Sequence, residues 1–161
     1  MKAIVQDHYG STDQLRLAEV PDPVAGPGEV LVRVGAAGVD RGTWHLMTGR
    51  PLAARLALGL RTPKDRTPGR DVAGTVEALG EGVTGYAVGD AVYGTARGSF
   101  AELAVVPTTR LAHRPSNLSV QEAAAVPVSA LTAYQALRAG GVKEGDRVLV
   151  MSARPGRIKR E

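Results

Sequence analysis

The chain has 161 residues, of which 43% are hydrophobic and 4% aromatic, so a single packed core would consist mainly of Val, Leu and Ala. It contains no cysteine, which excludes disulfides, thiolate nucleophiles and cysteine-ligated zinc. No apolar run approaches the roughly 20 residues of a membrane span, and residues 1–7 lack the apolar region of a signal peptide. We therefore expect a cytoplasmic protein without a membrane partner.

The positive charge of the chain is concentrated in two stretches. The formal net charge is +4, and residues 152–161 alone carry +3. Residues 50–70 hold six cations against Asp65, a net +5. Because no aromatic residue interleaves these cations, the pattern favours a solvated loop, with anion attraction as the second interpretation and a nucleic-acid partner as a distant third.

The N-terminal part has the pattern of strands separated by turns. Apolar positions predict strands at 3–5 and 15–20. Three prolines between residues 21 and 27 predict an extended connector, because proline lacks a ladder donor and fixes its own φ. In residues 30–34, valines recur with a period of two, which predicts a core strand.

The clearest motif lies at residues 69–80, Gly-Arg-Asp-Val-Ala-Gly-Thr-Val-Glu-Ala-Leu-Gly. Its alternating small and β-branched residues predict a strand from Asp71 to Leu79, with glycine turns at both ends. Residues 88–94, Val-Gly-Asp-Ala-Val-Tyr-Gly, predict a tight turn and a second short strand. The unit is thus two strands joined by a structured loop.

This unit resembles the catalytic domain of the medium-chain dehydrogenase/reductase superfamily, through the pattern G-x-[DE]-x-x-G-x-V followed by V-G-D-x-V. The resemblance covers residues 1 to about 151 and implies a mainly β fold with short helices (α+β). It implies a GroES-like β-barrel catalytic domain over residues 1–126. Residues 127–151 would form the crossover helix and the first strand of a truncated nucleotide-binding (Rossmann) domain, and residues 152–161 an irregular basic tail.

The resemblance also identifies the positions that would bind a metal. In zinc alcohol dehydrogenases of the superfamily, two cysteines and a histidine bind the catalytic zinc, and Asp40, Arg70 and Val128 occupy the matching positions here. A cation and an alkyl chain cannot ligate zinc, and residues 95–100 lack the structural-zinc cysteines. The sequence therefore predicts no metal. It resembles the zinc-independent branch, whose quinone oxidoreductase-like and enoyl reductase-like members transfer hydride from NADPH to a quinone or an activated enone.

The same stretch supplies the candidate catalytic and substrate-pocket residues. His45 matches the proton-relay position and could donate to an enolate oxygen, but a partly exposed histidine beside Trp44 is the interpretation that the sequence favours. Asp40 is the second catalytic candidate, and a capping role through nearby backbone amides fits it better. Trp44 and Leu46 could line an apolar acceptor pocket, with core packing as the alternative for Trp44.

Three residues are candidates for binding the cofactor. Arg41 lies where some relatives contact the cofactor phosphate, and an ordinary surface arginine is the alternative. Residues 124–137 resemble the crossover of the superfamily into its cofactor domain, which would place Thr132 and the nearby Ser129 near the nicotinamide. A threonine buried within a helix is the alternative for Thr132.

The C-terminal part predicts one strand and two helices. Residues 100–107 match a strand of the superfamily, and Ser119 with Glu122 forms a capping box that opens a short helix. Pro127 stops or redirects this helix, and a second helix follows at about residues 128–139.

Residues 147–151 match the first Rossmann strand, but the sequence after it does not continue the pattern. A glycine-rich turn should follow and hold a pyrophosphate, whereas residues 152–161 contain only Gly156, preceded by Pro155. This change predicts a truncated or frame-shifted chain. It also predicts self-association through the exposed C-terminal strand and helix.

The predicted function follows from these points. The chain would be the catalytic-domain portion of a zinc-independent, NADPH-dependent oxidoreductase acting on a small quinone or α,β-unsaturated carbonyl, and inactive alone. The alternative is a non-catalytic GroES-like module for binding or assembly, although the crossover pattern of residues 124–137 belongs to dehydrogenases.

Overall fold

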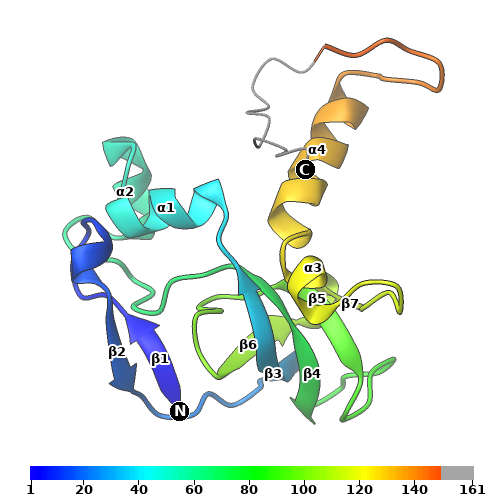
Figure 1. The fold of residues 1–161 in the computed structure, drawn as a ribbon. Helices are drawn as coiled ribbons and strands as arrows, with labels where there is room; N and C mark the ends of the chain where they lie inside the picture. The colour runs from blue at the N-terminus through cyan, green and yellow to red at the C-terminus, as the bar shows by residue number, and fades with distance from the viewer. Residues whose placement is uncertain (150–161) are drawn as a thin grey trace, which may run out of the picture.

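The computed structural model describes residues 1–149 and consists mainly of antiparallel sheet (Figure 1). The strands are β1 (Lys2–Val5), β2 (Arg16–Glu19), β3 (Glu29–Gly38), β4 (Asp71–Leu79), β5 (Ala91–Thr95), β6 (Leu103–Pro107) and β7 (Leu111–His113). Strands β1 and β2 pair with each other, and the other five form one sheet in the order β6-β3-β4-β5-β7. This is the mainly β, α+β fold that the sequence predicted.

Short helices connect and flank the strands. The helices are α1 (Arg41–Thr48), α2 (Arg55–Leu58), α3 (Val120–Ala124) and α4 (Pro127–Ala139), with 3-10 turns η1 (Thr12–Gln14), η2 (Leu52–Ala54) and η3 (Thr108–Arg110). In Figure 1, α1 and α2 lie together near one end of the sheet, and α4 rises from α3 away from the strands. Because α2 and η2 lie within residues 50–70, the prediction of a loop there was only partly right.

The five-stranded sheet curls along the pairing of β3 with β4. The register of this pair shifts between Leu31 and Val32 and again between Val34 and Ala36, and such bulges bend the bulged strand. Gly74 pairs with Val34 at the second register shift, and a Cβ added to Gly74 would be 2.0 Å from the carbonyl oxygen of Arg33. Only glycine therefore allows the two strands this close approach.

The hairpin of β1 and β2 extends the curl on the β6 side. The amide of Ile4 donates to the carbonyl of Phe100 at 2.8 Å, and the amide of Glu102 donates to that of Lys2 at 3.0 Å. Residues 100–102 thus pair with β1 in a short bridge, while the regular strand β6 begins only at Leu103. The predicted strand at 100–107 is therefore divided between two partners.

The core is aliphatic, as the composition predicted. One cluster of buried residues lies within the curl of the sheet and comprises Val30, Val32, Val72, Val76, Val92, Ala96, Ala104, Val106 and Leu111. A second cluster packs α3 against the sheet through Ala73, Ala123 and Ala124. Helix α4 follows directly after α3 and contains no buried residue.

Two sequence predictions at the C-terminal end meet the limit of the described residues. Residues 147–149 adopt no regular secondary structure, while 150 and 151, and the predicted basic tail 152–161, lie outside the described residues. Pro127 occupies the first turn of α4 and so begins the second helix. Within residues 1–149, no helix combines the length and the hydropathy that a membrane span requires.

Candidate functional site

Helix α1 carries most of the predicted catalytic and substrate residues. The sequence analysis assigned no helix there, because Gly42 and the β-branched Thr43 are weak helix formers. Asp40 supplies the missing start signal: its Oδ1 accepts from the Thr43 amide at 3.0 Å and its Oδ2 from the Thr43 hydroxyl at 3.0 Å. Both carboxylate oxygens of Asp40 therefore hold the start of α1.

His45 is oriented by the turn that follows α1. Its Nδ1 lies 2.9 Å from the carbonyl oxygen of Arg50. Because a carbonyl oxygen can only accept, Nδ1 carries the hydrogen in this contact. The Nε2 atom is then an acceptor in the neutral ring and a donor only in the imidazolium form. His45 can therefore donate to a substrate oxygen from Nε2 only when the ring is charged.

Trp44 and Arg41 form a pair on the same helix. The guanidinium carbon of Arg41 lies 4.7 Å from the centroid of the indole, a cation–π geometry. The His45 ring meets the Trp44 ring edge-on at 5.0 Å. Trp44 is 39% exposed, so the alternative of a core tryptophan is wrong.

A pocket of about 570 Å³ lies beside α1 and α2. The helices contribute its apolar residues, Leu46, Met47, Ala57 and Leu58. The remaining lining comes from Gln6, Tyr9, residues 63–65 and 67–70, residues 95–98 and Arg110. Leu46 is thus the predicted pocket residue that lines this cavity, whereas neither Trp44 nor His45 is among the described residues that do so.

The loop side of the pocket is strongly basic. Five charged side chains line it, a net +3: Lys64, Asp65, Arg70, Arg97 and Arg110. Within residues 1–149, none of the five makes a salt bridge. A smaller hollow of about 340 Å³ adjoins this side and shares Lys64, Asp65 and Arg97 with it.

Gln6 supplies a buried polar group in the wall of the pocket. Its side chain is nine-tenths or more buried, with 2% of the residue exposed, and Nε2 donates to the carbonyl of Met47 at 3.2 Å. Its Oε1 is buried and has no hydrogen-bond partner among residues 1–149. Buried acceptors in native proteins are normally satisfied, so this oxygen is an exception in the wall of the pocket.

Asp71 anchors the helix that carries Ser129 and Thr132. It is 1% exposed, and its Oδ1 accepts from the amide of Val128, in the first turn of α4, at 2.9 Å. Burial raises the pKa of Asp71 above its ordinary value, and the hydrogen bond from the Val128 amide lowers it by less. The nearby Asp40 carboxylate raises this pKa slightly further, and the Arg70 guanidinium lowers it slightly. Sequence reasoning missed this anchoring role, although Asp71 is the acidic position of the strand motif.

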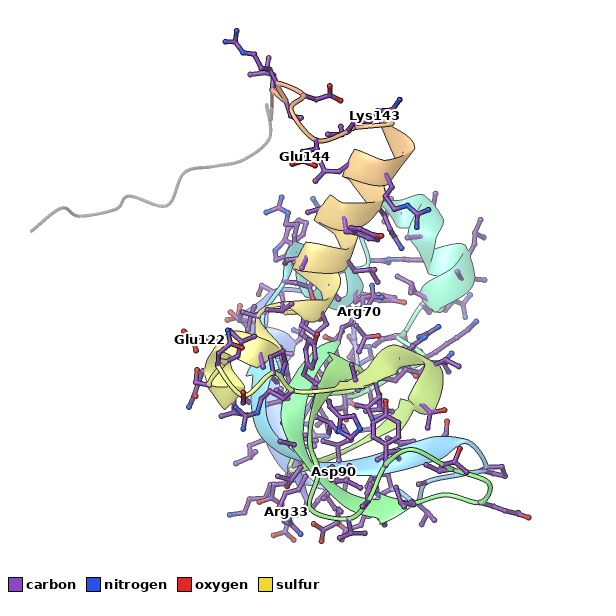
Figure 2. All side chains as sticks on the ribbon, turned by 90° about the vertical axis from the view of Figure 1, so that its right-hand side faces the viewer. Arg33, Arg70, Asp90, Glu122, Lys143 and Glu144 are labelled. Carbon is purple, nitrogen blue, oxygen red and sulfur yellow. The ribbon has the colours of Figure 1, made fainter. Side chains whose placement is uncertain are left out.

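The positions that match zinc ligands in zinc alcohol dehydrogenases converge near this anchor. Figure 2 shows Arg70 at the end of the sheet where α4 begins. A Cβ on Gly42 would lie 2.7 Å from an Asp40 carboxylate oxygen and 3.7 Å from an Arg70 guanidinium nitrogen. The donor set is thus one carboxylate, a guanidinium and the alkyl chain of Val128. Among residues 1–149, no three His, Cys, Asp or Glu residues form a group able to hold a metal.

Ser129 and Thr132 lie on α4, and both are exposed. The hydroxyl of Thr132 donates to the carbonyl of Val128 at 2.7 Å, within the helix. The alternative of a buried helical threonine is therefore wrong. Arg41, the third candidate for binding the cofactor, lies on the other helix, α1.

Comparisons with known proteins agree with this fold. Residues 26–116 match the alcohol dehydrogenase GroES-like domain. The chain is 34% identical to a 2-methylene-furan-3-one reductase of Solanum lycopersicum and 34% identical to a quinone oxidoreductase of Lama guanicoe, in each case over 97% of its length. The structure of mycobacterial Rv1454c complexed with NADPH superposes with a TM-score of 0.77 and 31% identity over 91% of the chain.

The matches cover only part of each relative. The chain spans 42% of the reductase and 46% of the quinone oxidoreductase, and it covers 44% of the mycobacterial structure. The family match nevertheless extends over more than half of this chain. The chain belongs to the alcohol dehydrogenase GroES-like domain family, in the quinone oxidoreductase-like branch of the medium-chain dehydrogenase/reductase superfamily.

Proposed function

We propose that this chain is the acceptor-binding, catalytic-domain portion of a zinc-independent, NADPH-dependent oxidoreductase. The whole enzyme reduces a quinone or an α,β-unsaturated carbonyl by hydride transfer. The observation that carries the proposal is the 570 Å³ pocket beside α1 and α2, near the end of the sheet where α4 begins. Its volume lies within the roughly 300 to 1,000 Å³ of small-molecule sites.

The names of the relatives support this reaction class. One relative is a quinone oxidoreductase and another a methylene-furanone reductase, and both match nearly the whole of this chain. Bound NADPH would supply the hydride. The protein residues would hold the acceptor beside the nicotinamide and stabilise the negative charge that develops on the carbonyl oxygen.

His45 is the proposed donor to that oxygen. It lies on α1 next to the pocket residue Leu46 but does not itself line the pocket, so the acceptor would have to extend beyond the pocket to reach it. Since Nδ1 is engaged with the Arg50 carbonyl, Nε2 is the atom that would donate, and only from the imidazolium form. The hydrogen bond from Nδ1 to the Arg50 carbonyl would fix the orientation of the His45 ring. Asp40 would act indirectly, by capping the helix that carries His45.

The residues proposed for the cofactor fit a phosphate and a nicotinamide. Arg41, Ser129 and Thr132 are exposed and offer a guanidinium and two hydroxyls. The sequence has no glycine-rich turn that would hold the pyrophosphate. We therefore propose that residues 1–126 form the catalytic domain and that the chain alone does not turn over.

We also propose that the chain associates with itself through α4. This helix exposes three large apolar side chains, those of Leu131, Tyr134 and Leu137. Sedimentation equilibrium should then give an average mass above the 16.8 kDa of one chain. A monomer at all concentrations would contradict this proposal.

Calorimetry and a chimera test the proposed reaction. Titration of NADPH into the purified chain should give no binding in the micromolar range. A chimera in which this chain replaces the matching part of the Lama guanicoe quinone oxidoreductase should oxidise NADPH when a simple quinone or enone is present. His45→Ala in the chimera should lower kcat, and Arg50→Ala should leave it unchanged, because the Arg50 contact uses only its backbone carbonyl.

Two outcomes would contradict the proposed function. A folded chimera that binds NADPH but reduces neither acceptor would favour the non-catalytic binding module. Micromolar NADPH binding and turnover by the chain alone would show that its own residues complete the nucleotide site.

A further inference from the structure

We infer that the pocket beside α1 and α2 selects an acceptor that carries an anionic group, a carboxylate or a phosphate. The identity of the ligand as an acceptor rests on the proposed function. The binding of its anionic group does not, because it depends only on the charges and the shape of the pocket.

The first support is the convergence of cations from separate parts of the chain. Lys64 and Arg70 come from the loop before β4, Arg97 from the loop after β5, and Arg110 from η3 before β7. Asp65 is the one acidic side chain among the described lining residues. An anion in the pocket would therefore face a net charge of +3 and be attracted electrostatically.

The second support is that two of these cations, Lys64 and Arg97, have no acidic partner among residues 1–149. Three other arginines do form salt bridges, Arg33 with Glu77, and Arg16 and Arg66 with Asp7, whereas Arg70 lies close to Asp40 and Asp71. Within residues 1–149, neither Lys64 nor Arg97 makes a salt bridge or a side-chain hydrogen bond. An anionic ligand would therefore not have to displace an internal carboxylate.

The third support is the division of the pocket into two sides. The helices contribute apolar side chains, including Leu46 and Leu58, whereas the loops contribute the cations. The smaller hollow extends the cationic side, since Lys64 and Arg97 line both cavities. A ligand with an apolar reacting part and an anionic tail fits this division better than a wholly apolar quinone does. The lining thus combines an apolar wall with a cationic wall, an arrangement that fits a ligand with an apolar part and an anionic group.

Ligand pairs that differ only in charge test the inference on the whole chain. We would titrate 4-oxopent-2-enoate and its methyl ester into the ¹⁵N-labelled protein and follow amide shifts. The chain has no cysteine to react with either enone. The acid should bind at least about fivefold more tightly than the ester and lose affinity from 50 to 500 mM salt, because exposed charges are screened. Shifts should concentrate in residues 63–70 and 95–98.

Matched variants locate the effect. Lys64→Gln and Arg97→Gln should each weaken binding of the acid by about three- to tenfold and leave binding of the ester unchanged. Arg61→Gln is the control, because Arg61 is also an exposed cation of residues 50–70 but does not line the pocket. Amide spectra would show that each variant is folded. Competition by acetate or by inorganic phosphate would distinguish a carboxylate site from a phosphate site.

Equal affinities for acid and ester, binding of neither, or an equal loss in Arg61→Gln would overturn the inference. The chimera separates this result from the proposed function. If the chain prefers the acid but the chimera reduces neither compound, the anion site stands and the proposed reaction fails. If the chimera reduces the ester as efficiently as the acid, the reaction stands and the anion site fails.

Discussion

The five-stranded sheet and helix α4 draw on the same kind of aliphatic residues but bury them very differently. Val92 in β5 is fully buried, whereas Leu131 in α4 is 52% exposed, and no residue of α4 is buried. The sheet curls on itself, so that the valines on its inner face bury one another. Helix α4 is held at its first turn by Asp71 and contacts β4 and β5, but none of its residues is buried within residues 1–149. Apolar composition alone therefore does not create a core, because burial also needs a facing surface.

The substitution with the largest expected effect is Gly74→Ala in the sheet. Its Cβ would meet the carbonyl oxygen of Arg33 at 2.0 Å, and a backbone atom cannot rotate away. We expect a loss of at least about 3 kcal/mol in the free energy of unfolding, measured by urea titration. Thr75→Ala, at the exposed next position, should change it by less than about 1 kcal/mol. Similar losses in both variants would contradict this account.

A matched pair of side-chain truncations tests the difference in burial between the sheet and α4 most directly. Val92→Ala removes two buried methyl groups and should cost about 2 kcal/mol, whereas Leu131→Ala should cost less than about 0.5 kcal/mol. Both free energies of unfolding can be measured by urea titration. These values apply to the monomer at low protein concentration, where a cost for Leu131→Ala near that of Val92→Ala would contradict this account. A cost that appears only at high concentration would instead reflect the proposed self-association through α4.

The capping box of α3 stabilises the helix that packs buried residues against the sheet, and its removal can be tested. The Ser119 hydroxyl accepts from the Glu122 amide at 3.2 Å, and the Glu122 carboxylate accepts from the Ser119 amide at 2.8 Å. Ser119→Ala should lower the free energy of unfolding by about 1 kcal/mol, and Ser119→Thr should restore most of it. Thermal unfolding followed by circular dichroism would measure both. An unchanged Ser119→Ala variant would mean that packing of Ala123 and Ala124 alone holds α3.

The smallest expected effect is the pH dependence of Asp71→Asn. Because burial raises the pKa of Asp71, its contribution to stability is complete below its ordinary value of 3.8 and is lost as pH rises through the folded-state pKa. The asparagine side chain would be neutral at every pH, and its carbonyl oxygen could still accept from the amide of Val128. The variant should therefore gain stability relative to the unsubstituted chain as pH rises above 3.8, until the buried carboxyl group is fully ionised.

Urea titrations at several pH values check the Asp71 prediction. Asp71→Ala is the control, because it removes the acceptor and should destabilise the start of α4 at every pH. An Asp71→Asn variant that loses stability relative to the unsubstituted chain as pH rises would contradict the burial argument.

Much of the fold could be predicted from local sequence patterns. The strand at Asp71–Leu79 was predicted with its observed bounds, because alternation and terminal glycines are local signals. The capping box at Ser119 and Glu122 is equally local. Helix α1 was missed because Gly42 and the β-branched Thr43 give its first turn weak helix propensity, although its Asp40 cap is as local a signal as the capping box of α3.

The candidate site was less accessible to sequence reasoning. The family pattern drew attention to residues 40–46, and of its two pocket candidates Leu46 lines the cavity while Trp44 does not. The cations of residues 50–70 were interpreted first as a solvated loop, because nothing in their spacing shows that Lys64 and Arg70 lie beside Arg97 and Arg110. These four side chains come from three separate connections, and only the curl of the sheet brings them together.

By itself, the sequence determined the strands, the aliphatic core and the family, since these depend on periodicity, composition and short motifs. The tertiary structure alone decided which polar groups meet. It joined Asp71 to the start of α4, left the Oε1 of Gln6 without a partner within residues 1–149, and gathered cations from distant loops around one pocket. The physical reason is that local patterns fix backbone geometry over a few residues, whereas charge and hydrogen bonding depend on distances between residues far apart in the chain.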